Sequence, residues 1–255
     1  MLFLGSFRMP VLAATLGAST LALVLSLAAP AQAAAQGHGG GSGSAAGRAT
    51  APSVTGSATF AGYQTPSLTG SAISSAAGFT LPKLSCTSVY RAITPVAGVE
   101  VNNYATYSSA FVFTGCHNGK ALYFPSLVVN GSETDYTSTP LSAGDVIKVG
   151  TNVTATGTTV KVTDVTKGVT KKLTGSGATP SAAYIGDSDW RTSGTLLGVP
   201  SFGKLTFTHC SVGGRTLASW NPVQYQRVNS SGVVQIATGA LPSAGTAFPT
   251  YYKHS

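Results

Sequence analysis

Charged residues are scarce in this sequence of 255 residues, of which only 9% are Asp, Glu, Lys or Arg. Fifteen Lys and Arg outnumber seven acidic residues, so the formal net charge is +8. Nucleic-acid binders concentrate their cations with interleaved aromatic residues, whereas the cations here are scattered. The one cluster, Lys167, Lys171 and Lys172, is typical of a solvated hairpin. The sequence argues against a nucleic-acid partner and leaves an anionic cell-wall polymer open.

Cysteine and histidine are also few. The three cysteines and four histidines form no close pair, so the ligands that zinc requires are missing, and we predict no metal and no cofactor. In an oxidising compartment, three cysteines imply one bridge and one remaining thiol. We predict a Cys86–Cys116 bridge, because each residue lies at the edge of an expected strand in the same half of the domain, and this leaves Cys210 over.

The N-terminus reads as an export signal. Arg8 precedes an apolar run from Val11 to Leu27, and Ala31-Gln32-Ala33 follows as a small-x-small cleavage site. A membrane anchor is the competing interpretation, but the run of about 17 residues is short for a bilayer and no basic cluster follows it. We predict a signal peptide over residues 1–33, no later membrane segment and a secreted protein. The Ala-rich signal and the composition favour a bacterial source.

A Gly/Ser/Ala-rich stretch follows the signal. Residues 34–56 lack the bulky side chains that would offset the entropy of ordering, which predicts a flexible leader. An inhibitory pro-segment is the alternative, although it would need side chains able to fill a cleft. Residues 57–255 remain, a length typical of one β-sandwich with a sizeable core.

Helical periodicity is absent from this remainder. Short runs alternate apolar and polar residues between Gly, Pro, Asn and Ser, which is the pattern of half-buried strands. We expect strands at 57–63, 74–81, 109–114, 121–130, 145–151, 158–164, 169–174, 182–185, 205–212 and 223–228. Asp145 follows a glycine at a strand start, a position more typical of backbone capping than of catalysis. The pattern predicts an all-β, antiparallel fold.

Several segments in a shared order resemble the glutamic peptidases, or eqolisins. They are 60–63, 77–82, 110–112, 141–147, 158–172, 181–185 and 199–208, and the resemblance covers about residues 57 to 215. It implies the family's fold, a concanavalin A-like β-sandwich of two antiparallel sheets with a concave groove.

The family's chemistry depends on a Gln and a Glu that activate water in acid endopeptidases. The family segment Ala-Glu-Trp-Ile-x-Glu resembles residues 182–187, where Ala183 replaces the first Glu and Asp187 the second. A methyl group cannot accept a proton, so Ala183 marks a lost catalytic position. No Gln occurs between Gln64 and Gln224, so the expected Gln is missing as well.

Other hydrolytic chemistries have little support. Glycosidases need two carboxylates about 5 to 10 Å apart. The closest pairs, Glu133 with Asp135 and Asp187 with Asp189, fall in segments that we interpret as polar loops, the latter followed by Arg191. No Gly-x-Ser-x-Gly motif indicates a serine hydrolase.

We therefore predict a non-catalytic secreted protein that binds a peptide or carbohydrate in the groove. The candidate groove residues are Tyr184, Asp187, Trp190 and Tyr123. The first three lie close to the lost position in the sequence, and Tyr123 falls on an expected strand that lines the concave face in the related fold. One alternative is an active acid endopeptidase that uses a shifted carboxylate, Asp187. Another is a basic structural protein associated with the cell wall.

Overall fold

The structure, a computed structural model, describes residues 54–192 and 195–254, which form one compact unit. The expected signal peptide and most of the expected leader lie outside this range. The first strand begins at Val54, three residues before the predicted start of the domain. No helix of the described part is long and apolar enough to cross a bilayer.

The described chain consists of strands and one short 3-10 helix. In order they are β1 (Val54–Ser57), β2 (Phe60–Gln64), β3 (Ala72–Thr80), β4 (Arg91–Val101), β5 (Thr106–His117), β6 (Lys120–Val129), β7 (Ser132–Asp135), β8 (Val146–Thr154), β9 (Thr158–Asp164), β10 (Val169–Gly175), β11 (Pro180–Ser188), β12 (Arg191–Thr192), β13 (Thr195–Leu196), β14 (Lys204–Val212), β15 (Arg215–Thr216), η1 (Leu217–Trp220), β16 (Val223–Val228), β17 (Val234–Thr238) and β18 (Phe248–Tyr252).

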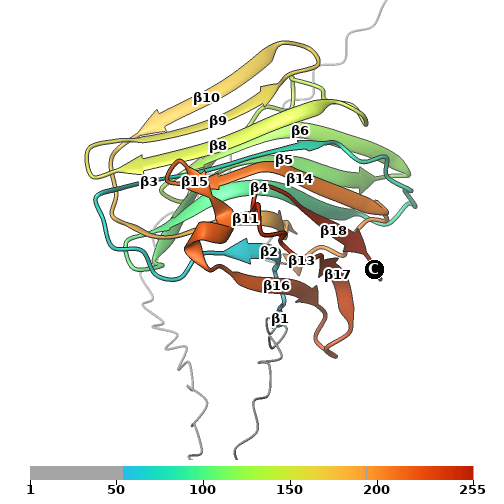
Figure 1. Cartoon of the computed structure of the whole chain (residues 1–255). Coiled ribbons are helices and arrows are strands. Elements are labelled where there is room, and N and C mark those ends of the chain that lie inside the picture. Colours follow the sequence, from blue (N-terminus) through green and yellow to red (C-terminus); the bar gives the residue numbers. More distant parts are fainter. Residues whose placement is uncertain (1–53, 193–194, 255) are drawn as a thin grey trace, which may run out of the picture. The chain divides into compact units, whose positions relative to one another are not determined.

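The strands form two packed layers that share β14 (Figure 1). The first layer has the order β10-β9-β8-β3-β14, and the second has the order β18-β17-β16-β2-β11-β4-β5-β6-β7. The C-terminal half of β14 pairs with β3, with a register shift between Thr208 and Ser211, whereas Lys204–Phe207 pair with β18. Every pairing between described strands is antiparallel except that of β1 with β16. The predicted β-sandwich is therefore confirmed.

The core lies between the layers, because β-branched and aromatic side chains alternate inward along each strand. Phe79, Ile147 and Phe207 are among its fully or nearly fully buried residues. Each such side chain contributes about 1.5–3 kcal/mol by leaving water. Two buried hydroxyls join the layers through carbonyls: Ser75 Oγ donates to Tyr184 O at 3.1 Å, and Thr151 Oγ1 to Ala97 O at 2.8 Å.

All ten expected strands are present, but the second layer contains strands that the sequence did not indicate. The longest of these is β4, whose interior holds Pro95 and Gly98, two residues that usually argue against a strand. The segment at Glu133 and Asp135, interpreted above as a loop, is the edge strand β7. Asp145 does cap its turn, since the backbone N–H of Ser142 donates to its Oδ2 at 2.7 Å.

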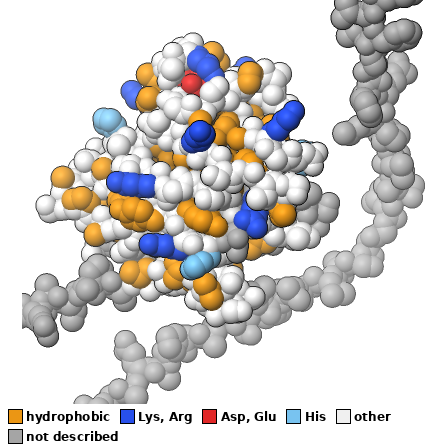
Figure 2. All heavy atoms as spheres, turned by 90° about the vertical axis from the view of Figure 1, so that its right-hand side faces the viewer, with side chains coloured by type: hydrophobic (Ala, Val, Ile, Leu, Met, Phe, Trp, Pro, Cys, Tyr) orange, Lys and Arg blue, Asp and Glu red, His pale blue; other side chains and the backbone are white. Residues whose placement is uncertain are grey.

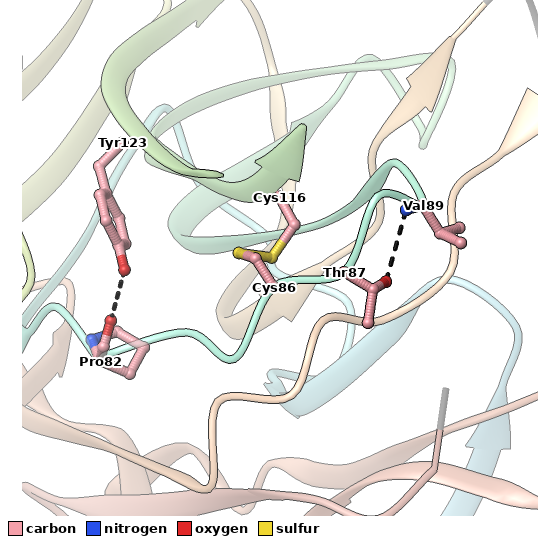
Figure 3. Close-up of a disulfide and its surroundings, with 6 residues drawn as sticks. All are labelled: Pro82, Cys86, Thr87, Val89, Cys116 and Tyr123. Atoms are coloured by element: carbon pink, nitrogen blue, oxygen red, sulfur yellow. Dashed lines mark hydrogen bonds between the residues drawn. A yellow bond between two sulfur atoms is a disulfide. The ribbon is translucent and has the colours of Figure 1, made fainter. Parts of the chain in front are cut away.

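The predicted disulfide between Cys86 and Cys116 is present (Figure 3). It joins the end of β5 to the irregular segment that connects β3 with β4. The same segment accepts a hydrogen bond at the Pro82 carbonyl from the hydroxyl of Tyr123, at 2.9 Å. These two links fix the β3–β4 connection against β5 and β6.

Candidate ligand-binding cleft

A cleft of about 620 Å³ opens on the face of the second layer that points away from the first layer. Its floor comes from β2, β4, β5, β7 and β11, and its rim from the chain after β11 and from β16. The lining residues are Ser57, Thr59, Phe60, Gln64, Thr94, Val96, Glu100, Tyr107, Ser109, Phe111, Glu133, Tyr184, Ser188, Asp189, Trp190 and Tyr225. The volume falls within the range of small-molecule and peptide sites.

Strand register brings the floor residues into one row. Tyr184 of β11 stands between Gln64 of β2 and Gly98 of β4, and Gly98 pairs with Ser109 of β5. The row continues through β6 to Glu133 of β7. Successive side chains of a strand point to opposite faces, so residues at even steps from this row also face the cleft.

Tyr184 crosses the floor of the cleft. A Cβ atom on residue 98 would collide with its ring, so the missing side chain of Gly98 makes room for the phenol. The Tyr184 hydroxyl is hydrogen-bonded to Ser109, and burial together with nearby Glu100 and Tyr107 raises its pKa well above the usual value. Tyr184 therefore remains a neutral hydrogen-bonding group at any physiological pH.

Glu100 lies next to this phenol, directly opposite Tyr107 in the β4–β5 ladder. Its side chain is half-buried, and no hydrogen bond from another described residue reaches its carboxylate. Burial raises the pKa of Glu100 to about 7. Near neutral pH both the protonated and the ionised form of this carboxyl are therefore populated. No cation of the described chain pairs with it.

Glu133 is the second carboxylate on the floor. Ser126 donates its hydroxyl hydrogen to Oε1 of Glu133 at 2.8 Å. Burial, with a smaller contribution from the charge of Asp135, raises the pKa of Glu133 despite this hydrogen bond. The pKa of Tyr107 is also raised, first by burial and then by the charges of Glu133, Asp189 and Glu100. Carboxylates thus surround a phenol in this part of the cleft.

Aromatic rings form the walls. Trp190 makes edge-to-face contacts with Phe111 and Phe113, with centroids 5.9 Å and 4.9 Å apart. Phe60 makes similar contacts with Tyr184 at 5.8 Å and with Tyr225 at 5.9 Å. Such pairs hold each ring at a defined angle, so the walls are preorganised for a ligand.

The structure brings two of the four candidate groove residues into the cleft. Tyr184 and Trp190 line it, whereas Asp187 and Tyr123 do not. Asp187 lies on the opposite side of β11, is completely buried and accepts a hydrogen bond from Thr250 Oγ1 at 2.6 Å. Tyr123 points to Pro82 within the core (Figure 3). The expectation that these two residues lie in the groove was wrong, because the alternation of β6 and β11 turns them inward.

Ala183 is fully buried and packs in the core between the layers. Its cleft-facing neighbour on β11 is Tyr184. A Glu side chain at position 183 in this register would point into the core, so Tyr184 is the residue of this segment that reaches the cleft.

Glu100 and Glu133 were missed as functional candidates. Glu100 belongs to the unpredicted strand β4, and Glu133 was assigned to a loop. The alternation of Val96, Gly98 and Glu100 could have indicated a strand with one face outside the core, but Pro95 conceals that signal. Among the described residues no group of three or more His, Cys, Asp or Glu is arranged to hold a metal ion.

The fold and the cleft define a β-sandwich of the glutamic-peptidase type. The model of the peptidase A4 family matches residues 58–241, so the chain belongs to this family, in agreement with the resemblance seen in the sequence. No protein of curated function matches the sequence significantly.

Three solved structures show the same fold. Scytalido-glutamic peptidase with a transition state analog inhibitor is 17% identical, with 77% of this chain and 98% of that chain covered and a TM-score of 0.64. SCP-B, an eqolisin in complex with the tripeptide Ala-Ile-His, is 16% identical, with the same coverage and a TM-score of 0.62. Aspergilloglutamic peptidase from Aspergillus niger is 20% identical over 64% of this chain and 99% of that chain, with a TM-score of 0.54.

Proposed function

We propose that this protein is exported and binds peptides in the cleft without hydrolysing them. The observation that carries the proposal is Tyr184, since a neutral phenol, and not a carboxylate, projects from β11 over the cleft floor. A general base must accept a proton from water, and a tyrosine whose pKa lies well above 10 does not do so at physiological pH. Among the described lining residues the one glutamine, Gln64, comes from β2, before the segment where the family resemblance expects one.

A peptide is favoured over a carbohydrate by the relatives of the same fold. The structures of two of them contain a peptide-based transition state analog and a tripeptide. The cleft combines aromatic walls with a few polar groups, Ser109, Glu100 and Glu133, which is the composition of sites that hold side chains and backbone amides together.

A second candidate function is endopeptidase activity. One observation favours it, namely the two floor carboxyls Glu100 and Glu133 with raised pKa values. Glu100, whose pKa is raised to about 7, would take a proton from water only where it is ionised, near or above neutral pH, and the adjacent phenol of Tyr184 would stabilise the oxyanion. The fully buried Asp187 is unsuited to this role because it does not reach the cleft.

The two tryptophans of the chain provide a direct test. Trp190 lines the cleft, whereas Trp220 is hydrogen-bonded to Val212 O outside it. In a Trp220→Phe variant, titration with peptides should change the fluorescence of Trp190 saturably, and mass spectrometry should recover each peptide intact from pH 3 to 8. An unchanged spectrum would refute binding. If the peptides are cleaved, and if this cleavage is lost in Glu100→Gln but kept in Asp135→Asn, the peptidase function would be favoured.

A further inference from the structure

We propose that the cleft selects peptides that carry a lysine or arginine side chain, and that Glu100 is the residue that recognises the cation. This inference rests on the proposed function and names the class of peptide that the cleft takes.

The distribution of charge supports this selectivity. Three of the seven acidic residues line the cleft, namely Glu100, Glu133 and Asp189. No Lys, Arg or His is among the lining residues whose side chains the structure describes. The face in Figure 2 differs sharply, since Lys and Arg side chains are scattered over it and hardly any acidic side chain is visible. A protein of net charge +8 thus collects negative charge in its cleft.

The remaining acidic residues have other surroundings. Asp145 and Asp164 lie 2.7 Å and 3.9 Å from the Nζ atom of Lys167. Asp187 is buried beside Thr250, and Asp135 is exposed on β7 outside the cleft. Glu100 and Glu133 therefore stand apart from the ion pairs that Lys167 forms with Asp145 and Asp164.

Glu100 lacks the partner that a half-buried carboxylate needs. Its solvation is reduced, yet no described residue donates a hydrogen bond to it and no described cation lies against it. Taking a charge out of water is costly unless a counter-charge compensates it. An ammonium or guanidinium group of a ligand would supply both the charge and the hydrogen bonds.

The aromatic rings offer a second contribution to cation binding. Tyr107 stands opposite Glu100 in the ladder, and Phe111 and Trp190 continue the wall beside it. A cation over the face of such a ring is attracted to its π electrons, most strongly for tryptophan. A long alkyl stem ending in a cation can therefore pack on the wall while its head reaches Glu100.

The test uses the chain lacking residues 1–33 and peptides that are acetylated and amidated, so that their termini carry no charge. The peptides are identical except at one position, which holds Lys, Arg, norleucine or Glu. We expect Lys and Arg peptides to bind about tenfold or more tightly than the norleucine peptide, with the Glu peptide weakest. In Glu100→Gln the Lys and norleucine affinities should become nearly equal, whereas Asp135→Asn, an equal charge change outside the cleft, should keep the preference.

A further peptide with a free α-amine and no lysine separates a terminal ammonium from a side-chain cation. Stronger binding of that peptide than of the Lys peptide would overturn the assignment to side chains. Equal binding of Lys and norleucine peptides would overturn the inference and leave the proposed function intact. Failure of every peptide to bind would overturn both. Circular dichroism and thermal unfolding of Glu100→Gln check that its fold is retained.

Discussion

At the scale of single residues, Gly98 determines how the floor of the cleft is built. It lies in the middle of β4, and the ring of Tyr184 occupies the space that a side chain would take. Glycine weakens strands in general, so its presence here is explained by the close approach of this ring.

Gly98→Ala should displace the Tyr184 ring, because the new methyl group and the phenol cannot occupy the same space. We expect a loss of about 1–3 kcal/mol in the free energy of unfolding and a weaker affinity for peptides. Gly150→Ala is the matched control, since Gly150 also lies in a strand and its nearest neighbour would be 3.9 Å from the new Cβ. Equal unfolding midpoints in urea for the two variants would contradict this account of Gly98.

Asp187 makes stability depend on pH. Burial raises its pKa to about 7, despite the hydrogen bond from Thr250 and the charge of Arg227. A carboxyl whose pKa is higher in the folded than in the unfolded state stabilises the folded protein when it is protonated. This contribution is complete below the pKa in the unfolded chain, near pH 4, and is lost as the pH rises towards 7. The free energy of unfolding from urea titrations should therefore fall between pH 4 and 7, and this fall should be smaller in Asp187→Asn. A steeper fall in the variant would be the contrary result.

The third cysteine is predicted to be unreactive. Cys210 is 1% exposed, and burial raises its pKa to about 12, so almost no thiolate exists at pH 8. Iodoacetamide should leave the native protein unmodified and label one site after unfolding in guanidinium chloride, as measured by mass spectrometry. Rapid labelling of the native protein at Cys210 would show that the β14 strand is more open than the structure indicates.

At the scale of secondary-structure elements, prediction from the sequence succeeded where alternation was undisturbed. The strands β8 and β9 bury every second residue, which is the pattern that the sequence displays. The strand β4 was missed because it is buried on both faces, one in the core and the other beneath the cleft, and contains Pro95. Burial on both faces removes the polar alternation that identifies a strand.

The candidate site was less predictable than the fold. Trp190 and Tyr184 were found because they flank the lost catalytic position, whereas Asp187 was assigned to the wrong side of β11. A shift of one residue in register turns every side chain of a strand to the opposite face, and a loose alignment cannot fix that register. Glu133 was missed since a short polar edge strand such as β7 resembles a loop in sequence.

The disulfide stabilises the connection between β3 and β4. Cys86 and Cys116 are 30 residues apart, so their bridge should contribute about 3–4 kcal/mol by restricting the unfolded chain. Replacing both cysteines by serine should lower the free energy of unfolding by about this amount, as measured by chemical denaturation under oxidising conditions. The same loss should follow reduction of the unmodified protein, and no change in either case would contradict the assignment.

At the scale of the whole molecule, the described cations lie outside the cleft, whereas three of the seven acidic residues line it. Cations are scattered over the face shown in Figure 2, whereas carboxylates and phenols line the cleft. This arrangement fits our proposal of an exported protein that can associate with anionic polymers through its surface while the cleft stays available for a cationic ligand. The signal peptide proposed for residues 1–33 would bring it to that location.

The central claim is that an eqolisin-type cleft binds peptides without cleaving them. The most direct measurement is equilibrium binding of a lysine-containing peptide to the chain lacking residues 1–33, with mass spectrometry of the same samples after prolonged incubation from pH 3 to 8. The account predicts saturable binding at neutral pH and full recovery of the intact peptide at every pH. Peptide fragments that accumulate in proportion to protein concentration, and that disappear with Glu100→Gln, would contradict it.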